Sequence, residues 1–230
     1  MNYAVILAEG EGKSFGAKIP KQFLKLNDKP ILIHTIDLFR KNNDIDNILV
    51  VVLESWVSYT EELIKTYFPR IKNIKIVEGG INKIDSTLSG LNFIQENYEL
   101  SNDDIVVIHD SVRPFCTKEV IKENIKIARL YGAVTTAKKS KEKMMICTTN
   151  NNVSEVLENE YIYQMQTPQT FRAKELYNLL EKTTNRNKII DLLSIYKNNN
   201  KVVKIVEGNE NNFIITKKED LERANKYLAR

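Results

Sequence analysis

A glycine-rich segment near the start of the sequence has residue types and spacing that suit the binding of an anion. It reads Ala8-Glu9-Gly10-Glu11-Gly12-Lys13-Ser14-Phe15-Gly16 and follows the apolar run Tyr3–Ala8. Glycines allow backbone N–H groups to come close to a ligand, and successive N–H groups in a turn form a concave site for anions. The segment therefore predicts an anion-binding loop at the end of a strand.

Two well-known nucleotide-binding motifs do not fit this segment. A P-loop that ends in Gly12-Lys13-Ser14 requires a glycine five residues before Gly12, and Leu7 stands there. A dinucleotide-binding fingerprint requires a glycine where Phe15 stands. The loop is therefore expected to hold its anion in a different way.

A second polar segment, Asp110-Ser111-Val112-Arg113-Pro114, follows the apolar run Ile105–His109. A single aspartate at the end of a strand is most often a helix cap. Here the arginine and proline that follow Asp110 favour a functional site. We expect His109 to pack in the interior rather than to act as an acid or a base.

The elements that must position these residues follow an alternating pattern. Short runs rich in β-branched residues are expected as strands that are buried on both faces. They are Tyr3–Ala8, Asn47–Leu53, Ile74–Val77, Ile105–His109, Ala133–Ala137 and Val202–Val206. The amphipathic segments between them are Pro30–Arg40, Tyr59–Phe68, Asp85–Asn97, Lys118–Leu130 and Lys174–Glu181. This alternation predicts an α/β fold in which βαβ units build a mostly parallel central sheet.

Residues 138–163 interrupt this alternation. The segment is polar and contains two short alternating runs, Lys143–Cys147 and Val153–Leu157, separated by an Asn-rich turn at residues 150–152. This pattern predicts a β-arm that projects from the domain. Because such an arm cannot bury itself on its own core, we expect it to pack against a second subunit in a homodimer.

Composition excludes several classes of protein. The chain has 230 residues and a net charge of +4, without the basic block that is typical of nucleic-acid binding. We expect one domain over residues 1–230.

No run approaches the roughly 18 apolar residues of a membrane span, and the start lacks the features of a signal peptide. Cys116 and Cys147 fit neither a disulfide framework nor a metal cluster. We therefore expect a cytoplasmic protein that binds neither nucleic acid nor a membrane.

Further segments along nearly the whole chain share one resemblance. They are the glycine loop, Pro20-Lys21-Gln22-Phe23-Leu24, Lys29-Pro30-Ile31, Glu78-Gly79-Gly80 with Asp85-Ser86, His109-Asp110-Ser111-Val112-Arg113-Pro114-Phe115, Gln166-Thr167-Pro168-Gln169-Thr170-Phe171 and Val206-Glu207-Gly208. In these segments the sequence resembles the cytidylyltransferase family that includes methylerythritol-phosphate and ribitol-5-phosphate cytidylyltransferases. The stretch Trp56-Val57-Ser58-Tyr59-Thr60 is closer to the ribitol-5-phosphate branch. The resemblance implies a Rossmann-like, three-layer nucleotidyltransferase fold of the GT-A-like type.

The resemblance also implies the reaction and the residues that carry it. In this family an oxygen of a polyol phosphate attacks the α-phosphorus of CTP, Mg²⁺ assists, and pyrophosphate leaves. Lys21 and Lys13 are the implied catalytic cations. The implied nucleotide contacts are Leu7, Ala8, Gly10, Gly12, Gly79, Gly80 and Ser86. The implied acceptor contacts are Asp110, Arg113, Thr167 and Asp191, and Asp110 also lies at the implied metal position.

Several positions depart from the family pattern. Ser14 stands where the family has an arginine, Ile214 where it has a lysine, Asn159 near a phosphate-binding arginine and Ile190 near a threonine. Glu9 replaces a small residue of the glycine loop. Replacement charge could come from a nearby lysine, and the possible ones are Lys13, Lys138, Lys139, Lys141, Lys143 and Lys217.

Three hypotheses therefore remain open at this point. The first is an active cytidylyltransferase with a remodelled acceptor pocket. The second is a family member that has lost its activity and serves as a binding or assembly partner. The third is a nucleotidyltransferase with another base or acceptor, which the changes at Asn159, Ile190 and Ile214 favour because all three lie on the acceptor side.

Overall fold

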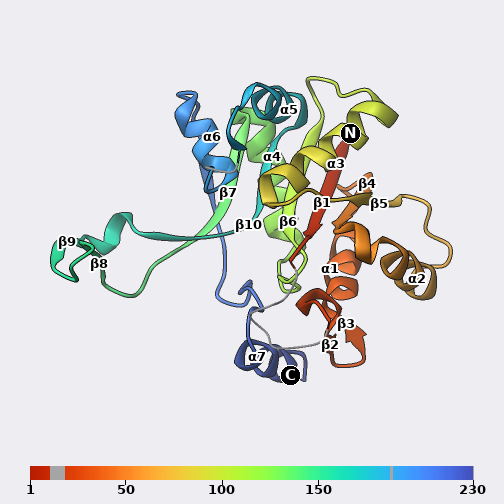
Figure 1. Ribbon diagram of the computed structural model, residues 1–230, viewed down its shortest axis with the longest axis horizontal. Helices are drawn as coiled ribbons and strands as arrows, with labels where there is room; N and C mark the ends of the chain where they lie inside the picture. Colours follow the sequence, from red (N-terminus) through yellow and green to blue (C-terminus); the bar gives the residue numbers. More distant parts are fainter. Residues whose placement is uncertain (11–18, 187–188, 230) are drawn as a thin grey trace.

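A computed structural model describes residues 1–10, 19–186 and 189–229 of the chain. Its centre is a seven-stranded sheet with the strand order β11-β7-β10-β6-β1-β4-β5 (Figure 1). The strands are β1 (Asn2–Ala8), β4 (Asn47–Val52), β5 (Ile74–Glu78), β6 (Ile105–Asp110), β7 (Ala133–Lys139), β10 (Tyr163–Arg172) and β11 (Lys204–Glu207).

The sheet is mostly parallel, as predicted. β1 runs parallel to β4 and β6, β4 runs parallel to β5, and β7 runs parallel to β11. β10 pairs antiparallel with both β6 and β7. Its pairing with β7 shifts register between Gln166 and Gln169, which is the irregularity of a β-bulge.

Helices cover both faces of the sheet and complete the predicted three layers. Alternate residues of β1 divide between the two cores: Ile6 packs with α1, α2 and α4, whereas Val5 packs with α3, α5 and α6. The helices on the first face are α1 (Ile31–Arg40), α2 (Val57–Tyr67) and α4 (Lys118–Tyr131). Those on the second face are α3 (Lys83–Tyr98), α5 (Ala173–Lys182) and α6 (Leu192–Asn198).

Smaller elements gather near one end of the sheet. α7 (Lys218–Leu228) lies beside the short hairpin of β2 (Lys25–Leu26) and β3 (Lys29–Pro30) at the end toward which β1 points (Figure 1). A third apolar cluster joins Leu26, Val112 and Ala224 there. The remaining short helices are η2 (Lys21–Phe23), η3 (Glu54–Trp56) and η4 (Asn159–Tyr161).

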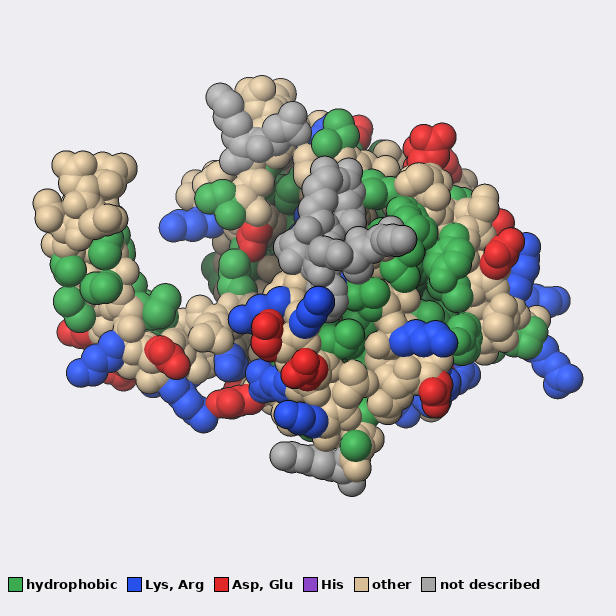
Figure 2. Space-filling view, turned by 60° about the horizontal axis from the view of Figure 1, so that its bottom comes forward, with side chains coloured by type: hydrophobic (Ala, Val, Ile, Leu, Met, Phe, Trp, Pro, Cys, Tyr) green, Lys and Arg blue, Asp and Glu red, His purple; other side chains and the backbone are tan. Residues whose placement is uncertain are grey.

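The predicted arm is present and stands away from the body of the molecule (Figure 1). β7 leads into it, β10 leads out of it, and β8 (Met144–Cys147) pairs antiparallel with β9 (Val153–Leu157) inside it. Hydrophobic side chains lie along its surface (Figure 2). The most exposed of them are Tyr161 at 74%, Val156 at 67% and Met145 at 60%.

Within the described residues, no helix combines the length and the apolar character that a membrane span requires.

Candidate active site

The site lies where the order of the parallel strands reverses. From β1 the chain proceeds to β4 and β5 on one side, and then returns to place β6 on the other side of β1. In open α/β sheets, ligands bind outside the carboxyl ends of the strands at such a point. Leu7 of β1 lies opposite Asp110 of β6, and the Ser111 N–H donates to the Leu7 carbonyl at 2.9 Å.

Asp110 forms two ion pairs at this point. Lys83 Nζ lies 2.9 Å from Asp110 Oδ1, and Arg113 Nε lies 2.9 Å from Asp110 Oδ2. Burial alone raises the pKa of the carboxyl, but the charges of Lys83 and Arg113 outweigh it and hold the pKa of Asp110 well below its ordinary value. Asp110 is therefore a carboxylate at neutral pH, and two cations face the same edge of the sheet.

Thr167 connects the backbone of Asp110 to the ring of His109. The Asp110 N–H donates to Thr167 Oγ1 at 3.1 Å, and Thr167 Oγ1 lies 3.0 Å from His109 Nδ1. His109 Nε2 lies 3.0 Å from the Arg113 carbonyl, an acceptor, so Nε2 carries the proton and Nδ1 accepts from Thr167. Burial lowers the pKa of His109 to about 4, which keeps the ring neutral. His109 therefore positions its neighbours from the interior.

The C-terminal segment closes this side of the site. Arg113 Nη1 donates to the Asn212 carbonyl at 2.8 Å, and Asn212 Nδ2 donates to the Thr167 carbonyl at 2.8 Å. Two positions further on, Ile214 packs against the apolar cluster of α7. Ile214, which replaces the lysine of the family, thus adds apolar contact here and no charge.

The loop after β5 is packed tightly against the first turn of α3. The Gly80 N–H donates to Ser86 Oγ at 3.1 Å, and the Gly79 N–H donates to the Val52 carbonyl at 2.7 Å. A Cβ atom at Gly80 would lie only 2.3 Å from Asp85 Cβ. The three predicted nucleotide-binding residues of this loop are therefore brought together and held in one conformation.

The loop after β1 is fastened by a buried glutamine. Gln22 Nε2 donates to the carbonyls of Ala8 and Gly10, at 2.7 and 3.0 Å. A Cβ atom at Gly10 would lie 3.6 Å from Lys21 Cε, so the predicted catalytic lysine borders this loop. The predicted residues Gly12 and Lys13, and the departure Ser14, lie outside the described residues.

Glu9 introduces a carboxyl group into this region. Burial raises its pKa; Lys83 and Lys21 oppose this shift, and Asp110 adds to it. These effects require that Glu9 lies close enough to the three charged groups to interact with them. The carboxyl group of Glu9 is therefore near Lys83, Lys21 and Asp110.

Asp191, a predicted acceptor residue, lies at the N-terminal end of α6. Its carboxylate accepts from the N–H groups of Leu193 and Ser194, at 2.7 and 3.4 Å, and so caps α6. Among the described residues, no hydrogen bond or ion pair joins Asp191 to Asp110. Ile190, beside it, is 91% exposed.

Lys83 is the residue that the sequence analysis missed. The helix was expected to begin at Asp85, whereas α3 begins at Lys83 because the Asn82 side chain accepts from the Asp85 N–H at 2.9 Å. An Asn three residues before an acidic residue is a helix-start signal, and it is visible in the sequence. This signal places Lys83 in the first turn of α3, beside the end of β6.

Comparison with known proteins shows the family to which this chain belongs. Residues 2–230 match the model of the 2-C-methyl-D-erythritol 4-phosphate cytidylyltransferase family. The chain belongs to this family. It is 39% identical over 228 residues to the ribitol-5-phosphate cytidylyltransferase of Lactiplantibacillus plantarum, with 97% of each chain covered.

Solved structures agree with this assignment. The 4-diphosphocytidyl-2C-methyl-D-erythritol synthase of Anaerococcus prevotii is similar with a TM-score of 0.85 and 29% identity, over 100% of this chain and 96% of that chain. The 2-C-methyl-D-erythritol 4-phosphate cytidylyltransferase of Francisella tularensis gives a TM-score of 0.80 and 28% identity, over 98% of each chain. The predicted family, fold and enzyme class, a cytidylyltransferase, are therefore confirmed, and the hypothesis of a member without activity is not favoured.

Proposed function

We propose that this chain transfers CMP from CTP to ribitol 5-phosphate, giving CDP-ribitol and pyrophosphate. The observation that carries the proposal is the 39% identity to a ribitol-5-phosphate cytidylyltransferase across 97% of the chain. The solved methylerythritol-phosphate enzymes are less similar, at 28–29% identity. The tightly packed Gly79–Gly80 loop and the paired cations at Asp110 supply features that such a reaction needs.

In this reaction an oxygen of the acceptor phosphate forms a bond to the α-phosphorus of CTP. The bond from that phosphorus to the oxygen of the pyrophosphate leaving group breaks. The protein has little covalent work to do, because the barrier falls mainly when two polyanions are held in line and their charge is balanced. Positioned backbone donors and cations are therefore the essential features.

The nucleotide side relies on backbone that cannot easily move. Ser86 holds Gly80 through its hydroxyl, and the close approach of α3 leaves no room for a side chain at Gly80. Fixed N–H and carbonyl groups in so tight a loop select a pyrimidine over a purine. On the other side of the nucleotide, Lys21 provides the charge that meets the triphosphate.

The acceptor side relies on Asp110 and its partners. Arg113 and Lys83 are already oriented by the carboxylate, so their remaining N–H groups are available to phosphate oxygens without a large loss of side-chain entropy. Thr167 fixes the backbone of Asp110. Lys83 adds a further positive charge to this side of the site.

We further propose that Asp110 holds the Mg²⁺ ion of the reaction. Its ionised carboxylate is a hard oxygen ligand, and Mg²⁺ bound to nucleotides needs only one or two carboxylates because phosphate oxygens and waters fill the other positions. An ion held there by Asp110 would neutralise charge on the phosphates.

We also propose a homodimer joined through the arm of residues 138–163, in a cytoplasmic enzyme. Met145 and Val156 lie opposite each other in the β8–β9 hairpin, and each is more than half exposed. Exposed apolar side chains of this kind are typical of a surface that another subunit covers.

Pyrophosphate release tests the function. The protein is supplied with Mg²⁺, one of CTP, UTP, ATP or GTP, and ribitol 5-phosphate, and the alditol product is identified by mass spectrometry. We expect release with CTP only, and its loss in Lys21→Ala and Asp110→Asn. Equal release with any nucleotide, or none with CTP, contradicts the proposal.

A further inference from the structure

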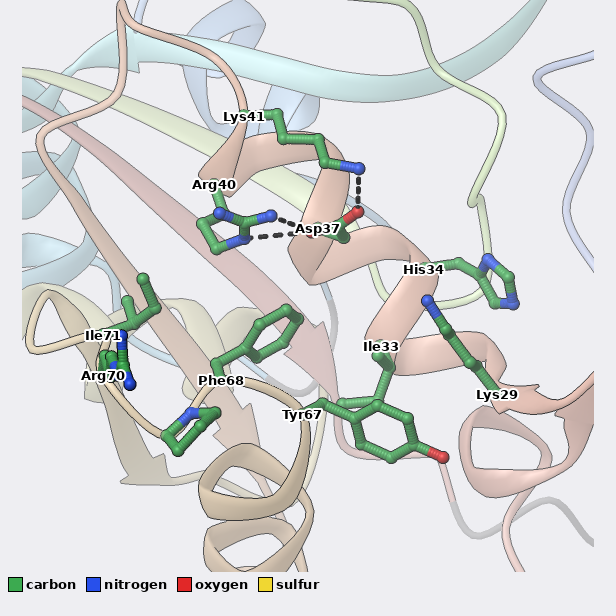
Figure 3. A pocket seen from close by; sticks show the side chains of 11 residues that line it. Lys29, Ile33, His34, Asp37, Arg40, Lys41, Tyr67, Phe68, Arg70 and Ile71 are labelled. Carbon is green, nitrogen blue, oxygen red and sulfur yellow. Dashed lines mark hydrogen bonds and ion pairs between the residues drawn. The ribbon is translucent and has the colours of Figure 1, made fainter.

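A second concave surface lies on the outer side of α1. It is a hollow of about 430 Å³ between α1, the C-terminal end of α2 and residues 68–71 (Figure 3). Lys29, from the end of the short β2–β3 hairpin, and Arg70, from the loop after α2, lie on opposite sides of it (Figure 3). None of the residues assigned to the active site lines this hollow.

Positive charge is concentrated in this pocket. Its lining contains four cations, Lys29, Arg40, Lys41 and Arg70, and one carboxylate, Asp37. Four positive charges less one negative charge leave +3, compared with +4 for the whole chain. The cations come from segments that are separate in the sequence, so the charge is gathered by the fold and not by a basic run.

The single carboxylate does not neutralise the pocket. Asp37 Oδ1 accepts from Arg40 Nη2 at 2.5 Å, and Asp37 Oδ2 lies 2.5 Å from Lys41 Nζ. Its negative charge is thus already shared by two cations. Lys29 and Arg70 are exposed, and neither forms an ion pair with any described residue. Two cations therefore remain for an anionic ligand.

The floor of the pocket is apolar and aromatic. Phe68 is 8% exposed, and the guanidinium of Arg40 lies over its ring at 5.5 Å. Figure 3 shows Phe68 between Ile71 on one side and Ile33 with Tyr67 on the other. A ligand that carries both a phosphate group and a carbon skeleton matches this combination better than a bare inorganic ion.

α1 separates this pocket from the active site. On its inner side, Thr35 Oγ1 donates to the Ser111 carbonyl at 2.8 Å, and the Phe39 ring lies 5.0 Å from the His109 ring. On its outer side, His34 Nε2 lies 2.8 Å from the Leu26 carbonyl. The two sites thus occupy opposite sides of one helix.

We propose that this basic pocket is a second binding site, which takes an organic phosphate monoester. The charges of Lys29 and Arg70 attract its phosphate group, and its carbon skeleton lies on Phe68 and Tyr67. The same chemistry could be supplied by an aromatic phosphate, such as a nucleoside monophosphate, or by a polyol phosphate. The two sources differ in how well they cover the aromatic floor.

Chemical-shift mapping on the ¹⁵N-labelled protein tests this site without any need for turnover. Phenyl phosphate and glycerol 1-phosphate serve as the aromatic and the polyol probes, and inorganic phosphate is the reference. We expect both esters to shift the amide signals of residues 37–41 and 67–71, and to bind more tightly than inorganic phosphate. The tighter of the two esters identifies the source.

Two double variants test whether the phosphate esters bind in the basic pocket. Lys29→Ala with Arg70→Ala should weaken binding by about tenfold or more, because two charge-assisted contacts are lost. Lys118→Ala with Lys122→Ala removes the same charge from exposed positions on α4 and should leave binding unchanged. The proposal is overturned if the pocket amides do not shift, if both double variants weaken binding equally, or if inorganic phosphate binds as well as the esters.

Discussion

Lys83 Nζ lies 2.9 Å from Asp110 Oδ1, although Lys83 opens α3 and Asp110 ends β6. The ion pair connects the helix that carries Ser86 with the strand that carries the proposed metal ligand. It therefore joins the nucleotide and acceptor halves of the site, and it fixes a cation where two polyanions meet.

The first prediction concerns this cation. Lys83→Ala should lower kcat/KM by about 10- to 100-fold, because a charge-assisted contact to phosphate is lost and Asp110 keeps only Arg113 as a partner. Steady-state kinetics with CTP and ribitol 5-phosphate measure the effect. Lys83→Arg should recover part of the loss, and Lys122→Ala should have no effect. Wild-type kinetics in Lys83→Ala would exclude Lys83 from the site.

The second prediction concerns the hydroxyl of Thr167. Thr167→Val keeps the shape of the side chain but leaves the Asp110 N–H and His109 Nδ1 without their partner. We expect the free energy of unfolding in urea to fall by about 1–3 kcal/mol, the cost of a buried group left unsatisfied. Thr167→Ser retains the hydroxyl and should lose much less. A loss in Thr167→Ser that equals or exceeds the loss in Thr167→Val would contradict this prediction, because only the serine variant keeps the hydroxyl.

The third prediction is a pH dependence that arises from His109. Burial lowers the pKa of His109 to about 4 in the folded protein. The unfolded chain has the ordinary value of about 6.5 and therefore binds a proton first as the pH falls. The contribution of the neutral His109 ring to the free energy of unfolding is fully present above pH 6.5. It should decline by about 1.4 kcal/mol per pH unit from there toward pH 4.

His109→Gln isolates this contribution. We expect this variant, which lacks the titrating ring, to be less stable than the wild type at pH 8. Urea unfolding of both proteins from pH 8 to pH 5 should therefore show a difference in stability that shrinks as the pH falls. If the difference stays constant over this range, His109 is not held neutral by the fold.

The fourth prediction concerns the arm. Met145→Lys with Val156→Lys places two charges on opposed positions of the β8–β9 hairpin. If the arm joins two subunits, burial of these charges is unfavourable, and light scattering after size exclusion should show a monomer. Thr149→Lys with Asn150→Lys adds the same charge at the exposed turn and should remain a dimer. A wild-type protein that is monomeric at micromolar concentration contradicts the proposed dimer.

The strands of the parallel sheet were predictable because their composition reflects their environment. Runs such as Asn47–Val52 are buried on both faces, so they are almost entirely apolar and β-branched. The antiparallel strand β10 was missed because its buried part is polar. Thr170 Oγ1 donates to Asn124 Oδ1, and Gln166 Nε2 donates to the Asn209 carbonyl. Such partners are distant in the sequence, and no local pattern reveals them.

Part of the predicted grouping of residues is present in the structure, because Gly80 contacts Ser86 and Asp110 contacts Thr167. Lys83 was missed because the start of α3 was placed two residues too late, which removed its side chain from consideration. The basic pocket was missed for another reason: Lys29, Arg40 and Arg70 are gathered by the packing of α1 against α2, so the sequence shows no basic run.

A competition between two acceptors tests the central claim most directly. The wild-type protein is given CTP, Mg²⁺ and equal concentrations of ribitol 5-phosphate and 2-C-methyl-D-erythritol 4-phosphate, and the products are counted by mass spectrometry at low conversion. The account predicts that CDP-ribitol predominates. A predominance of the methylerythritol product, or the formation of neither product, would contradict it.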